Sequence, residues 1–372
     1  MQVKELQLHR VRLPLVSPFR TAYGIQTVKD VLLVKAVADE AEGWGECVAM
    51  SFPGYSSEYT DAAALVIKAH LAPLILAADD LSGSDITERL SSVIGHNMAK
   101  TALEMAVLDA ELRASGQSFG SWIGSVTDRV PAGVSTGIAA SITELVQTVG
   151  GYLDDGYRRV KIKIQPGWDI EPVAVLRREL GEDFVLQVDG NGAYSSGSSG
   201  ELDHLAQLDR FALAMIEQPF APADLLGHAR LARQISTPIC LDESVSSPST
   251  AETALALGAC SVINVKAGRV GGYGEARRIH DLCRERGVAV WCGGMLETGL
   301  GRAANVALAA LPNFTLPGDL SASERYFSQD ITEPWRLVDG HLTVPDGPGF
   351  GVEIKADILE SLTTSVEYLS RP

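Results

Sequence analysis

The spacing of hydrophobic positions divides the chain into two parts with different secondary structure. Residues 3–12 and 29–38 are predicted as β-strands, and the second ends before the turn-rich stretch AEGWGECVAM, so a short meander is expected. Residues 57–76 and 96–115 are predicted as helices, and the second repeats Ala, Leu and Met at helical spacing. Strands followed by helices, with few alternations between them, predict an α+β unit over residues 1–125.

From about residue 130 the pattern changes to a repeated unit of one strand and one helix. Short apolar runs rich in β-branched residues recur, and helical segments separate them. Many such units in succession predict an α/β fold with a (β/α) barrel, here over residues 126–324. The predicted strands are residues 131–138, 159–164, 184–189, 213–219, 238–244, 262–268 and 288–294.

The stretch VKIKIQPGWD raises the question of which way a barrel strand directs its polar side chains. Lys161 and Lys163 alternate with Val160, Ile162 and Ile164, which is the period-two pattern of a strand. Both lysines therefore share one face of the strand. The alternation alone does not decide whether that face is the barrel interior or the solvent.

Ionisable residues end five successive predicted strands. These residues are Lys163, Asp189, Glu217, Asp242 and Lys266. Successive members are 24 to 28 residues apart, which is the length of one strand, one helix and two loops. The C-terminal ends of the strands of such a barrel meet at one mouth, where active sites lie. The sequence therefore predicts that these five side chains surround one pocket.

Three carboxylates at one barrel mouth predict a metal site. Asp189, Glu217 and Asp242 would repel one another unless a cation neutralised them. Ligation by oxygen alone suits Mg²⁺ (or Mn²⁺) rather than zinc. The alternative is that each carboxylate caps or pairs with the helix after its strand, but three in register on neighbouring strands favour the metal.

The lysines flank these carboxylates and predict proton transfer. Lys161 and Lys163 lie on the second strand and Lys266 on the sixth, so they would face one another across the bound substrate. A lysine near a divalent cation and other ammonium groups should have a lowered pKa, which suits removal of a proton near neutral pH. The cation would hold the substrate carboxylate and stabilise the enediolate formed when the α-proton leaves. For any single lysine, an ion pair or a surface position is the alternative.

Composition and charge exclude some classes of protein. A net charge of −16 and a pI near 4.9 argue against nucleic acid as a partner, because no basic field replaces counterions. The N-terminus lacks the apolar region of a signal peptide, and no stretch approaches the ~20 apolar residues of a membrane span. Five scattered cysteines without a CxxC pair indicate free thiols. We expect a cytoplasmic enzyme that binds no membrane.

The chain resembles the enolase superfamily, in its muconate lactonising subgroup, in the motifs KIKIQPGWD, DGN, IEQP, LDES, NVKAGRVGG and GGMLETGLGRAANVALAALPNFTLPGDLSAS. Within the subgroup it is most similar to the N-succinylamino acid racemase / o-succinylbenzoate synthase family, over its full length. The resemblance implies a modified (β/α)7β barrel with an α+β capping domain, formed by the N-terminal segment and a C-terminal tail at 325–372. It also implies a homo-oligomer, either a dimer or an octamer, and a small carboxylate as substrate.

The resemblance further implies a role for each residue of the pocket. Lys163 and Lys266 would be the acid/base groups of a two-lysine 1,1-proton transfer, and Lys161 would bind the substrate carboxylate. In the synthase reaction, a syn dehydration, Lys163 would act alone while the charge of Lys266 stabilised the enolate. Arg269 would either tune the pKa of Lys266 or form an ion pair at the mouth. The supports expected for the metal ligands are Asn191 and Glu243. Two loops of the capping domain, SPFRTAYG and SFPGYSSEY, would close over the substrate. The substrate contacts expected are Phe19, Tyr23, Phe52, Tyr55, Ser135, Gly137, Gly293, Met295 and Leu296.

Rival activities of the same fold differ at two places. Sugar-acid dehydratases need a histidine after the seventh strand, and WCGGMLETG has none. Dipeptide epimerases place Asp-x-Asp at the eighth strand, where this chain has only Asp319, so an N-acylated substrate is expected. A dedicated o-succinylbenzoate synthase of menaquinone biosynthesis, or a muconate-cycloisomerase-like enzyme, stays open. A non-catalytic protein is disfavoured because no lysine or metal ligand is missing.

Overall fold

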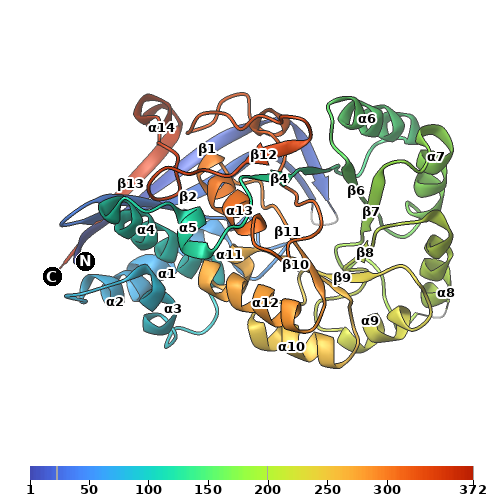
Figure 1. The fold of residues 1–372 in the computed structure, drawn as a ribbon, viewed down its shortest axis with the longest axis horizontal. Helices are drawn as coiled ribbons and strands as arrows, with labels where there is room; N and C mark the ends of the chain where they lie inside the picture. The colour runs from blue at the N-terminus through green and yellow to red at the C-terminus, as the bar shows by residue number, and fades with distance from the viewer. Residues whose placement is uncertain (22–23, 199, 372) are drawn as a thin grey trace.

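The computed structural model describes residues 1–21, 24–198 and 200–371. Figure 1 shows the capping sheet beside the parallel strands of the barrel, which helices cover on the outside. The capping sheet has four strands. The strands are β1 (Val3–Thr21), β2 (Gly24–Ala38), β3 (Glu42–Cys47), β4 (Arg129–Pro131), β5 (Gly133–Ser135), β6 (Arg159–Lys163), β7 (Val185–Asp189), β8 (Ile216–Glu217), β9 (Ile239–Leu241), β10 (Val262–Val265), β11 (Ala289–Cys292), β12 (His341–Thr343) and β13 (Thr363–Ser370).

The helices fall into a capping group, a barrel group and one helix before the last strand. The capping group is α1 (Thr60–Val66), α2 (Ala72–Leu76), α3 (Ile86–Arg89), α4 (Asn97–Ser115) and α5 (Phe119–Ile123), with a π-turn at Ile67–Leu71 joining α1 to α2. The others are α6 (Ile142–Asp154), α7 (Ile170–Leu180), α8 (Glu201–Ala206), α9 (Leu225–Ala232), α10 (Pro248–Ala256), α11 (Ala267–Val270), α12 (Tyr273–Glu285), α13 (Gly299–Ala309) and α14 (Ala356–Leu362).

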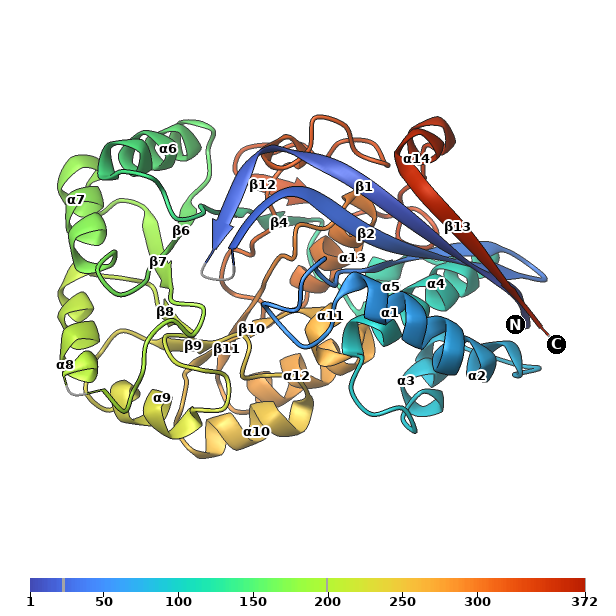
Figure 2. The same cartoon turned by 180° about the vertical axis from the view of Figure 1, so that it is seen from behind.

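The capping sheet joins the two ends of the chain. Its strand order is β13-β1-β2-β3, all antiparallel, and β13 pairs with β1 from Glu5 opposite Ser370 onward. The termini therefore lie side by side, as Figure 2 shows. The predicted α+β capping domain, formed by the N-terminal segment and the returning tail, is confirmed. The domain boundaries at 125/126 and 324/325 stay predictions.

Two glycines allow β3 to lie against the backbone of α4. A Cβ at Gly43 would come within 2.2 Å of the Ala106 carbonyl oxygen, and one at Gly45 within 2.0 Å of the Ala102 carbonyl oxygen. A side chain at either position would push the helix away from the sheet. The GWGECV motif thus sets the distance between the capping sheet and α4, which also contacts α11 of the barrel.

The barrel sheet has seven parallel strands in the order β11-β10-β9-β8-β7-β6-β5. Residues 314–319 close the ring, because Phe314 bridges Val290 of β11 and Gly318 bridges Ala132 beside β5. The Gly318 carbonyl also accepts a hydrogen bond of 2.7 Å from the Gly133 amide. The predicted modified (β/α)7β barrel is confirmed, with the eighth position taken by a segment that forms bridges to both edges.

The structure shows the direction in which the lysines of β6 point. Val160 and Ile162 are fully buried and belong to the apolar core, whereas Lys161 and Lys163 are directed into the barrel interior. Successive side chains of a strand point to opposite faces, so the apolar pair faces the helices and the cationic pair faces the barrel axis. The question left open by the sequence is thus answered: the shared face of the lysines is the interior.

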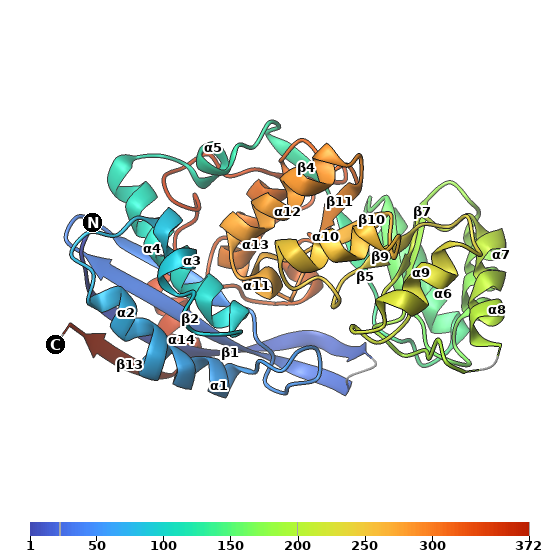
Figure 3. The same ribbon diagram turned by 90° about the horizontal axis from the view of Figure 1, so that it is seen from below.

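The segment at 14–24 differs from the loop expected over the substrate. Phe19 lies within β1 and is paired with Gln26 of β2, so this segment belongs to the two arms of a β-hairpin. Figure 2 shows the hairpin reaching from the capping sheet toward β6 and β7, and Figure 3 shows it beside the barrel from below. Strand pairing explains the difference, since the pairing of β1 with β2 is interrupted after Pro14 but resumes at Phe19 and continues to Thr21. Tyr23, expected at this tip, lies outside the described residues.

In the described part of the chain, no helix is long and apolar enough to cross a membrane. All five cysteines are free, as expected from their spacing: Cys47, Cys240, Cys260, Cys283 and Cys292.

Candidate active site

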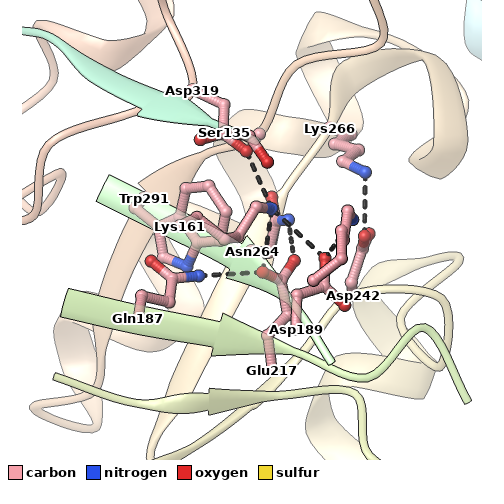
Figure 4. A network of polar contacts seen from close by, with 12 residues as sticks. Ser135, Lys161, Gln187, Asp189, Glu217, Asp242, Asn264, Lys266, Trp291 and Asp319 are labelled. Atoms are coloured by element: carbon pink, nitrogen blue, oxygen red, sulfur yellow. Dashed lines mark hydrogen bonds and ion pairs between the residues drawn. The ribbon is translucent and has the colours of Figure 1, made fainter. Parts of the chain in front are cut away.

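The five strand-end residues meet inside the barrel mouth. Figure 4 shows four of them: Asp189, Glu217, Asp242 and Lys266. Strand pairing places Lys163 opposite Asp189 and Asp189 opposite Glu217. Asp242 follows β9, and Lys266 follows β10, so the order around the barrel repeats the order in the sequence. The prediction that these side chains come together at one mouth agrees with this geometry, and two of the five, Lys163 and Lys266, line a cavity there. Their catalytic and metal-binding roles stay predictions.

Each carboxylate of the predicted metal triad bonds to an ammonium group. Lys163 Nζ lies 2.5 Å from Asp189 Oδ2, and Lys161 Nζ lies 2.9 Å from Glu217 Oε2. Lys266 Nζ lies 2.8 Å from Asp242 Oδ2. The three carboxylates are at most 1% exposed, so none of these charges could stay buried without a partner.

The donor set fits a divalent cation, although the carboxylates stand apart in this arrangement. Within residues 1–21, 24–198 and 200–371, no three His, Cys, Asp or Glu side chains are gathered as a ready metal-binding group. The three carboxylates nevertheless supply buried oxygens at neighbouring strand ends, which is the ligand chemistry that Mg²⁺ prefers. Asp189, Glu217 and Asp242 would hold the cation once they turned away from the lysines.

The lysine pKa values here differ from those expected with a cation in the pocket. Burial lowers the pKa of Lys161, but the charges of Asp319, Glu217 and Asp189 outweigh burial and raise the pKa above its ordinary value. For Lys266, burial is likewise outweighed by interaction with Tyr55 and other groups, so its pKa is raised. The lowered lysine pKa predicted from the sequence therefore depends on the carboxylates being engaged by a cation instead.

The eighth position contributes Asp319, which completes an ion-pair network. Its Oδ2 lies 2.8 Å from Lys161 Nζ, and its Oδ1 lies 2.5 Å from an Arg159 guanidinium nitrogen. Burial alone would raise the pKa of Asp319, but Arg159 and Lys161 hold it well below its usual range. The ring of Trp291 lies beside Lys161, whose Nζ is 4.8 Å from the ring centroid.

Two further residues hold Glu217, and sequence reasoning missed both. Gln187 donates a 2.8 Å hydrogen bond to Glu217 Oε2, and Asn264 donates one of 2.8 Å to Oε1. Each lies two residues before a predicted site residue, Gln187 before Asp189 and Asn264 before Lys266. The alternation that placed Lys161 inside would have identified them, because residues two apart on a strand share a face.

The predicted supports lie beside the carboxylates. The Asn191 amide donates a 2.8 Å hydrogen bond to Asp189 Oδ1, and its side chain donates one of 2.9 Å to Glu243 Oε1. Arg269 forms an ion pair with Asp242 and donates a 2.7 Å hydrogen bond to the Val245 carbonyl. Arg269 thus touches the same carboxylate as Lys266, which agrees with either role that the sequence left open.

A cavity of about 50 Å³ is lined by all three lysines, Lys161, Lys163 and Lys266. Of the predicted substrate contacts, Phe19, Ser135 and Leu296 line it. Arg302, which was not predicted, also lines it. An outer cavity of about 310 Å³ shares Phe19 and Leu296 with the inner one and is lined by both arms of the hairpin and by Phe52. The two cavities therefore adjoin at Phe19 and Leu296.

The remaining predicted contacts occupy other positions. The Tyr55 hydroxyl lies 2.9 Å from Asp242 Oδ1, and Lys266 Nζ lies 4.6 Å from the centre of its ring. Gly137 lies under the hairpin, where a Cβ would be 2.7 Å from the Arg20 carbonyl oxygen. Met295 packs in the core of the capping domain rather than in the pocket.

Gly293 does not line the inner cavity, but it leaves space for the neighbouring Lys266. A Cβ at this position would lie 2.2 Å from Asn264 Oδ1 and 2.6 Å from Lys266 Cε. A side chain here would displace both residues, so the glycine leaves the space that Lys266 occupies.

Comparisons with known proteins identify the family of the chain. Residues 4–124 match the family model for the mandelate racemase / muconate lactonizing enzyme N-terminal domain, and residues 144–358 match the enolase C-terminal domain-like model. An N-succinylamino acid racemase of an Amycolatopsis species is 56% identical over 99% of this chain and 100% of its own length. The chain belongs to the N-succinylamino acid racemase / o-succinylbenzoate synthase family of the enolase superfamily.

Other members of this family support the same assignment. An o-succinylbenzoate synthase of Geobacillus stearothermophilus is 43% identical over 100% of this chain and 98% of its own. The crystal structure of an enolase-superfamily member from Listeria innocua superposes with a TM-score of 0.95 at 39% identity, covering both chains completely. The protein is therefore an enzyme of a family of isomerases and lyases, and enzymes of this superfamily use a divalent metal ion.

Proposed function

We propose that this enzyme racemises N-succinylamino acids by a two-lysine 1,1-proton transfer, and that it also catalyses the syn dehydration that yields o-succinylbenzoate. The observation that carries the proposal is the position of Lys163 and Lys266. They line one cavity from β6 and from the end of β10, on either side of the three carboxylate strands. Relatives named for each of the two activities cover the whole chain.

The proton transfers follow from this placement. One lysine, as a neutral amine, takes the α-proton from one face of the substrate and becomes an ammonium. The other lysine, as an ammonium, then gives its proton to the opposite face of the same carbon. The result is inversion at the α-carbon with no net change in protons, and the two lysines exchange protonation states.

Asp189, Glu217 and Asp242 would bind Mg²⁺, whose positive charge would stabilise the enediolate oxygens of the deprotonated substrate. Those carboxylates would then no longer pair with Lys163 and Lys266, so either lysine could lose its proton near neutral pH. Lys161 keeps Asp319 as a partner, and it stays an ammonium that binds the substrate carboxylate.

An N-acylated substrate fits the ion pairs at the eighth position. A free substrate amine would need a carboxylate at the mouth, and Asp319 already bonds to Arg159 and Lys161. The cavity lined by the three lysines is also lined by Arg302 and Asp319, so most of its charged lining residues are cationic. Such a lining suits a substrate with two carboxylates, as an N-succinylamino acid has.

Two narrower alternatives are a dedicated o-succinylbenzoate synthase and a muconate-cycloisomerase-like enzyme. Only racemisation needs Lys266 as a base. Of the two roles left open for Arg269, tuning the pKa of Lys266 is the one that racemisation would use, since its guanidinium shares Asp242 with that lysine. Assembly as a dimer or octamer, and a cytoplasmic location, are further proposals.

Activity with and without the metal is the first test. Racemisation of a panel of N-succinyl-L-amino acids is followed by circular dichroism with Mg²⁺, with EDTA, and with Mg²⁺ restored. We expect activity to be lost with EDTA and recovered on adding the metal. Turnover that EDTA does not reduce would contradict the scheme.

The two reactions are separated by comparing Lys163→Ala with Lys266→Ala on both substrates. We expect Lys163→Ala to lose racemisation and dehydration, because both need this base. Lys266→Ala should lose racemisation and keep measurable dehydration. A wild-type enzyme that dehydrates but racemises no N-succinylamino acid would instead support the dedicated synthase.

A further inference from the structure

Lys29 of β2 is a lysine buried completely between the capping sheet and the barrel. Its exposure is 0%, and its Nζ donates hydrogen bonds of 2.9 Å to the Met295 carbonyl and 3.4 Å to the Val48 carbonyl. Among the residues that the structure describes, no carboxylate lies within ion-pair distance of this ammonium. Burial consequently lowers the pKa of Lys29, although the negative charges of Glu46 and Glu297 offset part of this effect.

The segment that Lys29 holds forms a wall of the substrate cavity. Leu296 lines both the inner cavity and the outer one, and its backbone has a φ of 55°, a left-handed conformation that a leucine rarely adopts. Met295, the residue before Leu296, is held by hydrogen bonds through both its carbonyl and its amide. Met295 accepts from Lys29, and its amide donates a 2.8 Å hydrogen bond to Glu297 Oε1.

Glu46, on the neighbouring strand β3, holds the next part of the same segment. It accepts hydrogen bonds of 3.0 Å from the Thr298 amide, 2.7 Å from the Thr298 hydroxyl and 3.0 Å from the Gly301 amide. A Cβ at Gly301 would lie 2.8 Å from Glu46 Oε2, so glycine permits this approach. The capping sheet therefore reaches residues 295–301 through two buried ionisable side chains, Lys29 and Glu46.

We propose that Lys29 is a positioning residue for substrate selection: from the capping domain it holds the Met295 carbonyl and so fixes Leu296 in the wall shared by the two cavities. The inference deepens the proposed function, because it takes N-succinylamino acids as the substrates that meet Leu296. Lys29 itself does not line either cavity.

A packing role alone does not account for this residue. A methionine has nearly the length of lysine and would fill the same space without the cost of burying an ammonium. What the lysine adds is a hydrogen bond to a backbone carbonyl next to a residue in a strained conformation. Such strain persists only where surrounding contacts hold it in place.

The test compares Lys29→Met with Lys35→Met, a control on the same strand. Lys35 bonds to Glu42 at the sheet surface and does not contact the segment. Racemisation is measured for N-succinylamino acids with small and large side chains. We expect Lys29→Met to raise KM about tenfold for large side chains, with kcat changed by less than about threefold, and to reduce discrimination by size. Lys35→Met should leave both constants as in the wild type.

A double-variant cycle tests whether Lys29 acts through Leu296. In a Leu296→Ala background, Lys29→Met should change KM little further, because the side chain it positions is absent. Lys29→Gln, which keeps an N–H donor without the charge, should fall between the wild type and Lys29→Met. Additive effects in the cycle, or an unchanged KM and size preference with only a lower Tm, would overturn the proposal.

Amide hydrogen exchange separates this inference from the proposed function, since it needs no turnover. In Lys29→Met the amides of residues 293–301 should exchange faster, while those of β6 and β7 stay as protected as in the wild type. If the wild type racemises no N-succinylamino acid, the proposed function fails, and the exchange result still decides whether Lys29 holds the segment. Unchanged exchange at 293–301 would overturn the inference whatever the enzyme turns over.

Discussion

At the residue scale, the two lysines of β6 differ in their partners although they are chemically identical. Lys161 is surrounded by Asp189, Glu217 and Asp319, whereas the ion pair of Lys163 is with Asp189. A cation that engaged Asp189 and Glu217 would still leave Lys161 paired with Asp319. The surroundings thus favour Lys161 as a permanent cation and Lys163 as the group that exchanges a proton.

Arginine substitutions separate these two tasks, because a guanidinium keeps its charge but does not lose a proton near neutral pH. We expect Lys163→Arg to lower kcat for racemisation by about 10³-fold or more, the size expected for loss of an acid/base group. Lys161→Arg should lower kcat/KM by roughly 10-fold to 100-fold, since a cation remains to bind the carboxylate. Steady-state kinetics on purified variants checks both, and equal losses in the two variants would contradict the division of roles.

At the element scale, buried glutamates hold the N-termini of two helices that follow barrel strands. Glu46 accepts from residues at the start of α13, and Glu104 of α4 accepts from the Tyr273 and Gly274 amides at the start of α12. Burial raises the pKa of each from 4.5 to about 7. In both cases the capping domain supplies the carboxylate and the barrel supplies the helix.

These raised pKa values predict a pH dependence of stability. A carboxyl whose pKa is higher in the folded state contributes stability that is present below its unfolded pKa, near 4.5, and is lost as pH rises through about 7. Relative to Glu46→Gln, the wild type should lose about 2–3 kcal/mol of unfolding free energy between pH 4.5 and 7.5. Urea unfolding at several pH values measures this slope, with the exposed Glu360→Gln as control. A slope that is the same in wild type and Glu46→Gln would show that Glu46 does not titrate in this range.

The hairpin of β1 and β2 is a second element whose position affects the site. It brings Phe19 into the inner cavity and rests on the segment after β5, where the Ile138 amide donates a 3.0 Å hydrogen bond to the Arg20 carbonyl. Gly137 lies at this contact, with no room for a Cβ between it and Arg20. The hairpin therefore closes on the barrel only while residue 137 has no side chain.

Alanine at Gly137 should displace the hairpin and leave the rest of the fold intact. We expect Gly137→Ala to raise KM by about tenfold, with Tm lowered by no more than a few degrees, because the clash falls on one contact. The matched control is Gly151→Ala in α6, where a Cβ would meet nothing within 4 Å and helix propensity should stabilise the protein slightly. KM that stayed at the wild-type value in Gly137→Ala would show that the hairpin need not rest on this residue.

At the scale of the whole molecule, the barrel could be predicted from the sequence, and much of the interface between cap and barrel could not. Each strand–helix unit has nearly constant length, so the strand ends Asp189, Glu217 and Asp242 repeat at a regular spacing that local patterns show. The contact of Lys29 with Met295 joins residues far apart in the chain, and only the packed fold brings them together.

The remaining differences between sequence and structure have similar physical causes. The arms of the β1–β2 hairpin looked like loop because PLVSPFRTAYG contains glycine and two prolines, whereas pairing with a neighbouring strand extends both. Gln187 and Asn264 were missed because neutral amides do not stand out by charge. The closing segment 314–319 has no strand pattern of its own and is defined by bridges to both edges of the sheet.

The central claim, that two lysines work on opposite faces of one carbon, is tested most directly by α-proton exchange in D₂O. Each enantiomer of an N-succinylamino acid is incubated with wild type, Lys163→Ala and Lys266→Ala, and NMR and chiral chromatography follow deuterium and configuration. We predict that the wild type exchanges and racemises both enantiomers. Each variant should exchange one enantiomer only, a different one in each case, with retention of configuration. Racemisation by either variant at the wild-type rate, or no exchange by the wild type, would contradict the account.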